Sequence, residues 1–306
     1  MTAHIAVLAN PSAGKGRARA VAAIASARLR EAGASVLEYA GGTAQQTYDL
    51  VLQAVAAGPD ALVVVGGDGT LAGILDVVIE HTVPVTVVPA GTGNDLARSL
   101  GVPMNDPAAA ALLALHGRPR TIDVGRVRSA AGTRHFLTVA ALGFDAKVSD
   151  RTDRLRWPRG PLRYYLALVI ELLRLRPLPF RISIDRTQLR DAPGVLIAVG
   201  NTASYGGGMP MCVGAEPDDG LLDIVHVSPL GRLRLVRVFP RLLRGTHLGL
   251  PEVERSRGRS VEVSAPGLIV YADGERVATS SCVIEIRDSA LTVMTPLPGD
   301  PVPPPT

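Results

Sequence analysis

The feature that most constrains the fold is a regular alternation of short apolar runs and longer amphipathic segments up to about residue 120. The apolar runs HIAVLAN, SVLEYA, ALVVV and VTVVPA have the length of buried strands. The segments between them, residues 16–33, 43–58 and 70–80, have the length and composition of helices, and the first two end at Gly33 and Gly58. Buried strands joined by helices form parallel sheets. This part of the chain is therefore predicted to be an open, doubly wound sheet, which binds ligands beyond the carboxyl ends of its strands.

The rest of the sequence consists of many short β runs separated by turn residues, with helical insertions near residues 161–176 and 231–247. Strands in such close succession favour an antiparallel sandwich or barrel. The predicted fold class is α/β + β, with a doubly wound α/β domain over residues 1–120 and a β-sandwich-like domain over residues 121–296. The proline-rich end, residues 297–306, is predicted to be a disordered tail.

The composition is that of a globular protein, with 47% hydrophobic and 20% charged residues among 306. A formal net charge of +4 does not suggest nucleic acid as a partner, since net charge speaks to solubility and non-specific binding. Cys212 and Cys282 make neither a disulfide framework nor a zinc site. The N-terminus lacks the pattern of a signal peptide, and no window has the roughly 18 apolar residues of a membrane span. A cytoplasmic protein is therefore expected.

Three of the predicted parallel strands end in a glycine-rich loop that opens a helix: NPSAGKG, GGDGT and PAGTGND. Glycine lets the backbone approach a ligand closely, and the N-terminus of a helix carries a partial positive charge. Three such loops along one sheet edge predict a cradle for a polyanion such as the phosphates of a nucleotide. For any single loop, the alternative remains that its glycines only make the turn from strand to helix.

Two familiar phosphate-binding motifs do not fit. GDGTLA, Gly67 to Ala72, matches the dinucleotide pattern G-x-G-x-x-A, but the acidic residue expected about 20 positions later is missing. NPSAGKG lacks the full spacing of a P-loop and has no hydroxyl residue after Lys15. A dinucleotide site and a Walker site are therefore both disfavoured.

Asp68, in the middle of GGDGT, is the unusual residue of the three loops. A carboxylate repels phosphate unless a divalent cation or a substrate proton lies between them, so Asp68 suggests magnesium or a hydroxyl nucleophile. The alternative is a turn residue or the N-cap of the helix that begins at Thr70. Asp95, in GTGNDLAR, has the same two interpretations.

In this order, NPSAGKG, GGDGTLAGIL and PAGTGNDLARSLG resemble the diacylglycerol kinase catalytic domain of soluble bacterial lipid kinases, a family related to sphingosine and ceramide kinases. The resemblance continues through IDVGRV, GFDA, GNTASYGGGM, AEPDDGLLDIVHV and YADGE, and so covers nearly the whole chain. GGDGT alone would be weak because NAD kinases share it, whereas GTGNDLAR favours the lipid-kinase branch. The resemblance implies a nucleotide-binding α/β domain beside a β-sandwich domain, with the active site in the cleft between them.

The resemblance also implies roles for individual residues. The ATP site would be lined by the three glycine loops, namely Asn10, Pro11, Ser12, Ala13, Gly14, Lys15, Gly66, Gly67, Asp68, Gly69, Thr70, Leu71, Ala72, Thr92, Asn94 and Asp95. Either Glu275 or Asp273, in the DGE motif, would be the catalytic base, with Asp68 on the metal or the hydroxyl. An Asp-Gly pair between β runs is also a strong hairpin signal, and both interpretations of DGE can hold. The family's threonine after the second strand is replaced here by Gly41, with Thr43 two positions on.

A structural magnesium site is implied at EPDDGLLD. Its protein ligands would be the carboxylate of Asp219 and the backbone carbonyls of Glu216 and Leu221, with water completing the shell, as is usual for magnesium. Two adjacent aspartates before a glycine are also a common solvated turn, which is the alternative.

A basic, apolar segment suggests how such an enzyme would reach a lipid. Residues 151–176 contain seven arginines against two acidic residues, with a tryptophan and two tyrosines flanking the run LALVI. Within the predicted helix, one stripe consists of Arg163, Ala167, Glu171 and Arg174, and the rest is apolar. Such a segment is suited to an anionic membrane surface, which would place the protein peripherally at the inner face of the membrane. The alternative is that its apolar faces pack on the sandwich while its arginines are solvated.

The first hypothesis is an ATP- and Mg²⁺-dependent lipid kinase that phosphorylates a primary hydroxyl and converts diacylglycerol to phosphatidic acid. The alternatives are a kinase for sphingoid bases or other lipids, an NAD kinase-like enzyme, and a nucleotide- or lipid-binding protein without catalysis. GTGND and the long β-rich second domain speak against the NAD kinase. The expected partners are the lipid substrate and, transiently, a membrane surface. Nucleic acid is not expected, and a homodimer is left open.

Overall fold

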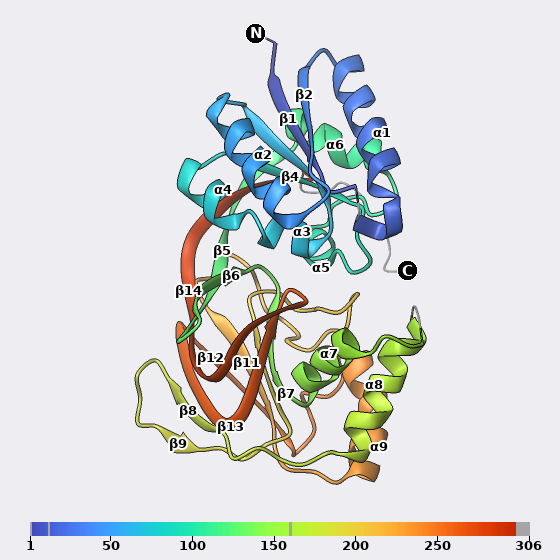
Figure 1. Ribbon diagram of the computed structural model, residues 1–306. Helices are drawn as coiled ribbons and strands as arrows, with labels where there is room; N and C mark the ends of the chain where they lie inside the picture. The colour runs from blue at the N-terminus through green and yellow to red at the C-terminus, as the bar shows by residue number, and fades with distance from the viewer. Residues whose placement is uncertain (1, 12, 159–160, 298–306) are drawn as a thin grey trace. The chain divides into compact units, whose positions relative to one another are not determined.

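The computed structural model of the protein describes residues 2–11, 13–158 and 161–297 (Figure 1). The chain divides into two compact units: unit 1 is the chain up to Asp123 together with the segment from Asp288 onward, and unit 2 is Val124–Arg287. The segment from Asp288 onward thus rejoins unit 1, whereas the sequence analysis placed it, up to residue 296, in the second domain. The predicted tail lies outside the described residues except for Leu297.

Unit 1 is an open α/β sheet with strands in the order β14-β4-β3-β1-β2, all paired in parallel. Helix α1 packs on α6 and α2 packs on α4, and the strands pass between these pairs in Figure 1. Every residue of β3 is buried, as its unbroken apolar run predicts. The strands are β1 (His4–Ala9), β2 (Ser35–Ala40), β3 (Ala61–Gly66), β4 (Val85–Pro89) and the end of β14 (Glu275–Thr295). The helices are the 3₁₀ turn Ala13–Gly16, α1 (Ala18–Glu31), α2 (Ala44–Ala56), α3 (Asp68–Ala72), α4 (Leu75–His81), α5 (Asp95–Ser99) and α6 (Pro107–His116).

The single helix predicted over residues 70–80 is two short helices. Helix α3 starts at Asp68 and ends at Ala72, and α4 starts at Leu75 after the link of Gly73 and Ile74. The break fits the low helix propensity of glycine. It also places Asp68 inside the first turn of a helix rather than before it.

Unit 2 is mainly antiparallel, with strands in the order β12-β11-β10-β7-β13-β14 and with β8 and β9 continuing from β13. Strand β13 pairs with β8 over its first half and with β7 over its second half, on either side of a register shift between Ser264 and Ile269. The strands are β5 (Arg118–Ser129), β6 (Gly132–Phe136), β7 (Val139–Gly143), β8 (Arg181–Ile184), β9 (Arg190–Asp191), β10 (Leu196–Gly200), β11 (Leu222–Val227), β12 (Val253–Gly258), β13 (Ser260–Ala272) and β14. The helices are α7 (Phe144–Arg154), α8 (Pro161–Leu173) and α9 (Arg232–Leu243).

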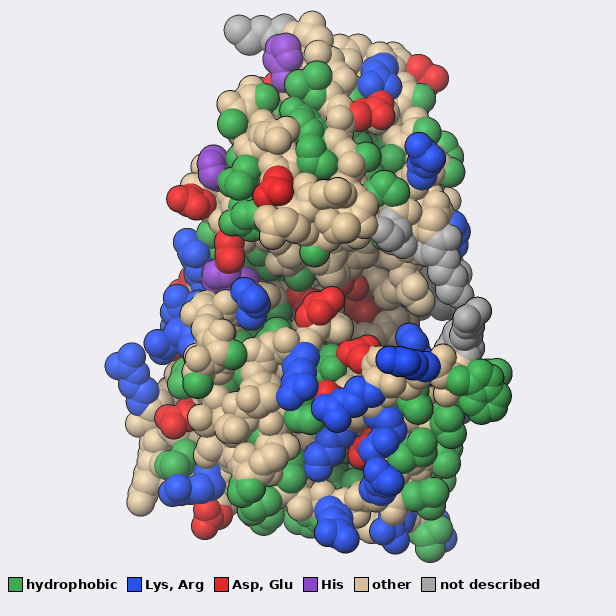
Figure 2. Space-filling model, viewed as in Figure 1, with side chains coloured by type: hydrophobic (Ala, Val, Ile, Leu, Met, Phe, Trp, Pro, Cys, Tyr) green, Lys and Arg blue, Asp and Glu red, His purple; other side chains and the backbone are tan. Residues whose placement is uncertain are grey.

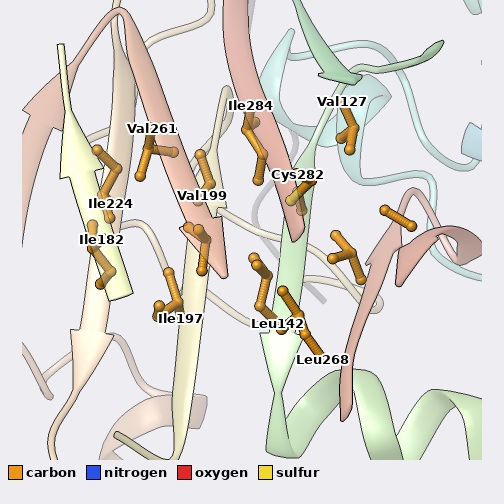
Figure 3. Close-up of a cluster of buried hydrophobic side chains, with 14 of the residues drawn as sticks. Val127, Leu142, Ile182, Ile197, Val199, Ile224, Val261, Leu268, Cys282 and Ile284 are labelled. Atoms are coloured by element: carbon orange, nitrogen blue, oxygen red, sulfur yellow. The ribbon is translucent and has the colours of Figure 1, made fainter. Parts of the chain in front are cut away.

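The central strands of unit 2 are buried on both faces. Ile197 and Val199 of β10 join the core between the sheet layers, in which Val261 of β13 also lies (Figure 3). The residues that alternate with them, Leu196 and Ala198, face a second apolar cluster that also contains side chains of α7, α8 and α9. Helices therefore cover one side of the sheet. The sequence pattern predicts α8 and α9 but not α7.

Candidate active site

The loops at the carboxyl ends of β1, β3 and β4 contact one another closely. A Cβ atom on Gly14, whose φ is +58°, would lie 1.9 Å from the carbonyl oxygen of Ala90. A Cβ atom on Gly91 would lie 2.6 Å from Cα of Gly67. Glycine at these positions is thus required by loop packing, and the three loops predicted to form a cradle do meet at one edge of unit 1. We call this region the three-loop edge.

Asp68 is a helix cap, although for a different helix from the one proposed. Its Oδ2 accepts a hydrogen bond of 2.9 Å from the backbone N–H of Asp95, and its Oδ1 accepts one of 3.1 Å from that of Leu96. Asp68 thereby caps α5 and links the second glycine loop to the third. Burial raises the pKa of Asp68, and the two backbone hydrogen bonds oppose that shift. These two N–H groups are already engaged, so α5 does not offer them to a phosphate.

Asn94 shapes the third loop from within. Its backbone is left-handed, with φ at +54°. Its side-chain Oδ1 accepts a hydrogen bond from the N–H of Gly91 at 2.9 Å, and its Nδ2 donates one to the Gly91 carbonyl at 3.1 Å. The side chain of Asn94 thus holds the loop in shape through a local amide pair.

The other residues assigned to ATP differ in their exposure. Those that are at least partly exposed at the three-loop edge, where a nucleotide would have access to them, are Asn10, Pro11, Ala13, Gly67, Gly69, Thr70, Ala72 and Thr92. Gly66, the last residue of β3, is buried. Leu71 is only 1% exposed and belongs to the core, so its side chain cannot line the site. Ser12 lies outside the described residues, as does the side chain of Lys15.

Position 41, where the family often has a threonine, has room only for glycine. A Cβ atom on Gly41 would lie 2.6 Å from the backbone nitrogen of Thr47, so no larger residue fits there. Thr43 is the N-cap of α2, and its hydroxyl accepts the N–H of Gln46 at 3.2 Å.

In unit 2, the DGE motif is a tight hairpin turn, as its Asp-Gly pair predicts. Asp273 and Gly274 both have positive φ, at +47° and +83°, which a type I′ turn requires. The Asp273 carboxylate accepts hydrogen bonds from the N–H of Leu137 at 2.7 Å, from the N–H of Thr138 at 2.9 Å and from its hydroxyl at 2.5 Å. Asp273 therefore fastens the turn to the segment between β6 and β7.

Asn201 strengthens the same attachment. Its side-chain Nδ2 donates a hydrogen bond of 3.0 Å to the carbonyl of Leu137, and its backbone N–H donates one of 2.8 Å to the carbonyl of Thr138. Thr138 and Asn201 were not assigned a role from the sequence, although Asn201 lies in the quoted motif GNTASYGGGM. Because these contacts join residues far apart in sequence, the motif was the only available signal.

Glu275 differs from Asp273 in its surroundings. It is exposed, and its carboxylate has no hydrogen-bond or ion-pair partner in the part of the chain that the structure describes. Beside it, Arg276 lies 3.4 Å from the carboxylate of Asp150 on α7, and Tyr271 donates a hydrogen bond of 2.8 Å to Asp153 on the same helix. Helix α7 thus holds both flanks of the turn and leaves the Glu275 carboxylate open to a substrate.

The GFDA motif contributes a further carboxylate on α7. Asp145 accepts a hydrogen bond of 2.6 Å from the hydroxyl of Tyr205, which belongs to GNTASYGGGM. Burial raises the pKa of Asp145, whereas the bond from Tyr205 lowers it. Two motifs that the sequence analysis quoted without a role are thus joined by this contact.

One of the residues predicted to hold a structural magnesium ion contacts other parts of the chain. Asp219 accepts a hydrogen bond from the N–H of Leu221 at 3.0 Å and also contacts the guanidinium group of Arg257 on β12. Glu216 is exposed. Among the described residues, no group of three or more His, Cys, Asp or Glu side chains is placed to hold a metal ion. In this structure Arg257 neutralises the charge of Asp219, and magnesium at this segment stays a prediction.

The glycine-lined edge of the α/β unit suits phosphate groups, and the exposed carboxylate at the hairpin of the β-sandwich unit suits proton transfer, as a phosphotransferase requires. Residues 4–127 match the diacylglycerol kinase catalytic domain, and residues 138–295 match the YegS C-terminal NAD kinase beta sandwich-like domain. The chain therefore belongs to the diacylglycerol kinase family, and the predictions of family, fold class and enzyme class are confirmed.

Individual relatives agree with this placement. The chain is 44% identical to "Diacylglycerol kinase" of Mycobacterium tuberculosis over 96% of both chains. It is 36% identical to "Probable lipid kinase YegS-like" of Pseudomonas fluorescens over 85% of this chain and 84% of the relative. A crystal structure of a diacylglycerol kinase from Bacillus anthracis superposes with a TM-score of 0.73 at 24% identity, covering 96% of each chain, which supports the fold.

Proposed function

We propose that the protein is an ATP- and Mg²⁺-dependent lipid kinase that transfers the γ-phosphoryl group to the primary hydroxyl of diacylglycerol, giving phosphatidic acid. The observation that supports this substrate most directly is the full-length similarity to a relative named "Diacylglycerol kinase", at 44% identity. The exposed backbone of the three-loop edge supports ATP as the phosphoryl donor, because glycine loops leave N–H groups accessible to phosphate oxygens.

The proposed chemistry needs little covalent participation by the protein, since phosphoryl transfer depends mainly on positioning and charge neutralisation. Glu275 accepts the proton of the lipid hydroxyl as that oxygen forms its bond to the γ-phosphorus, and ADP leaves. Asp273 holds the DGE turn in place through its three hydrogen bonds. Asp68 holds the second and third glycine loops together.

Magnesium is compatible with Asp68 at the three-loop edge. Each carboxylate oxygen of Asp68 accepts one backbone hydrogen bond, which leaves each with lone-pair capacity for a cation or its water. Carboxylate oxygen and water are the ligands that magnesium prefers. When bound, the ion would neutralise charge on the phosphates.

The test is transfer of phosphate from γ-labelled ATP, with and without magnesium, to lipids in mixed micelles. The panel contains diacylglycerol, monoacylglycerol, sphingosine and ceramide, with NAD as a soluble acceptor. We expect label on diacylglycerol and none without magnesium. Label on a sphingoid lipid alone, or on NAD alone, would reject diacylglycerol as the substrate. Bound ATP with no labelled acceptor would indicate a binding protein without catalysis.

A further inference from the structure

Helix α8 presents an apolar stripe to solvent, the reverse of an ordinary surface helix. Leu162, Tyr165, Val169 and Leu173, spaced along one face, are 65%, 60%, 51% and 66% exposed. The opposite face carries Ala167, which is fully buried, and Glu171, which is 7% exposed. Two residues of the predicted charged stripe, Ala167 and Glu171, thus face the protein, where Glu171 pairs with Arg151 of α7. Only part of the apolar surface, including Leu168 and Leu172, packs on the second core cluster.

Helix α9 shows the same arrangement. Leu235, Val238 and Leu242 are buried in the cluster on which α8 also packs. Leu233, Val236 and Leu243 point away from it and are 78%, 52% and 52% exposed. Both helices lie at the same end of unit 2 in Figure 1, and Figure 2 shows hydrophobic side chains along that edge beside a group of Lys and Arg side chains.

We call this region the two-helix surface. Its exposed apolar residues are Trp157, Leu162, Tyr165, Val169, Leu173, Leu233, Val236 and Leu243. Along α8 these residues form one exposed apolar stripe, and exposed apolar area of this kind marks a site of interaction with a protein or a membrane.

The charges on the two-helix surface are almost all positive. Six exposed arginines in or beside α8 and α9 form no ion pair with any carboxylate of the described chain, namely Arg156, Arg174, Arg176, Arg232, Arg237 and Arg244. Helix α9 contains no acidic residue, and the acid of α8, Glu171, is buried and paired. The partner must therefore be anionic as well as apolar.

We propose that the two-helix surface docks on an anionic phospholipid bilayer, with its apolar side chains in the interface and its arginines on lipid phosphates. A second copy of this chain is a poorer occupant, because it would bring a second set of unpaired arginines against the first. Among the described residues, no helix is long and apolar enough to cross a membrane, so α8 and α9 would lie along the surface. The proposal rests on the proposed function only in giving docking a purpose, namely access to a substrate within the bilayer.

The first test is co-sedimentation of the full chain with phosphatidylcholine vesicles that contain or lack phosphatidylglycerol. We expect binding to the anionic vesicles, and a loss of about 100-fold in the triple variant R232Q/R237Q/R244Q, since each arginine near an anionic leaflet contributes about fivefold. The matched control R19Q/R186Q/R287Q changes net charge equally, at exposed arginines elsewhere, and should bind like the wild type. Equal loss in both triples would reduce the effect to net charge and overturn the proposal.

The apolar contribution is tested with L173D/L233D against I24D/L37D, all at exposed positions where folding should tolerate the change. We expect vesicle binding to fall at least about tenfold in the first variant only. Unchanged vesicle binding by L173D/L233D would overturn the proposal. If that variant also converted a dimer to a monomer in sedimentation velocity, the surface would be an interface between copies.

Kinetics separate this proposal from the proposed function. With a water-soluble, short-chain diacylglycerol, R232Q/R237Q/R244Q should turn over like the wild type, whereas transfer to vesicle-embedded diacylglycerol should fall with vesicle binding. Equal losses on both substrates would contradict a docking role. If the wild type phosphorylated neither substrate, the proposed function would fail, and the sedimentation result would still decide the docking proposal.

Discussion

At the scale of the residue, the two carboxylates of the DGE turn perform different tasks. Asp273 accepts three hydrogen bonds that hold the hairpin to the segment before β7. Glu275, two residues on, is exposed and has no partner in the described chain. A base must take up a proton, and Glu275 can do so without giving up a structural bond. The sequence left the base open between these two residues, and their surroundings favour Glu275.

This difference predicts opposite effects of two conservative substitutions. Glu275→Gln should lower kcat by about 100-fold or more, as loss of a general base does, and leave the midpoint of thermal unfolding unchanged. Asp273→Asn places an amide against N–H donors, so it should lower the free energy of unfolding by about 1–3 kcal/mol. Steady-state kinetics and thermal unfolding on the same preparations check both. If Asp273→Asn abolished transfer with an unchanged midpoint, the two roles would be reversed.

Asp68 should show both a structural and a functional effect. Asp68→Ala removes the cap of α5 and should cost about 1–2 kcal/mol of stability. Asp68→Asn keeps one oxygen acceptor and should cost less, yet both variants lose the charge proposed to face magnesium and should lose transfer. Urea unfolding and the labelled-ATP assay measure the two effects separately. Full activity in Asp68→Asn would show that Asp68 serves only as a cap.

At the scale of the element, the sequence predicted β1 to β4 and most helices of unit 1 because apolar periodicity is a local signal, but it placed the end of β14 in the second domain. It could not identify α5 as the helix that Asp68 caps, since that contact joins residues 27 apart. The attachment of Asp273 to Leu137 spans 136 residues and was equally out of reach. The outward face of α8 was missed for a related reason. The partner of its buried Glu171 is Arg151 of α7, a helix that was itself not predicted.

The segment between Glu216 and Asp223 yields a prediction about metal dependence. Asp223 is 1% exposed and lies 2.7 Å from Nε of Arg255 and 3.3 Å from Nε of Arg257. Two arginines of β12 thus supply the positive charge that a cation would otherwise bring to this segment. We expect EDTA to leave the thermal midpoint of the wild type unchanged.

The variant Arg255→Gln tests whether the arginines of β12 stabilise this segment. The Asp223 carboxylate is buried, but Arg255 is 35% exposed and Arg257 stays beside Asp223, so the loss of Arg255 should cost about 1–3 kcal/mol and lower the midpoint by several degrees. Arg190→Gln, which loses the exposed pair with Glu254, is the control and should change stability by less than about 1 kcal/mol. A wild type that loses stability in EDTA and regains it with magnesium would restore the predicted metal site.

At the scale of the whole molecule, two buried histidines make stability depend on pH. His226 is 6% exposed and His247 is not exposed at all. Burial lowers the pKa of each, although Glu254 partly opposes this for His226 and the Met211 carbonyl does so for His247. Burial therefore favours the neutral form of both histidines in the folded state.

Because the pKa of each histidine is lower in the folded than in the unfolded chain, the unfolded state binds more protons as the pH falls through about 6.5, and stability declines. Between pH 7 and 6 the loss is at most about 1.4 kcal/mol for the two residues together. Asp68 and Asp145, whose pKa values burial raises, act in the opposite sense, so the histidine contribution needs a difference measurement.

Urea unfolding of the wild type and of H226Q/H247Q at both pH values measures the histidine contribution to stability. The variant should lose less stability than the wild type over this interval, whereas His4→Gln, at an exposed position, should keep the wild-type slope. Equal slopes in all three proteins would mean that the buried histidines take up protons as readily in the folded chain as in the unfolded one.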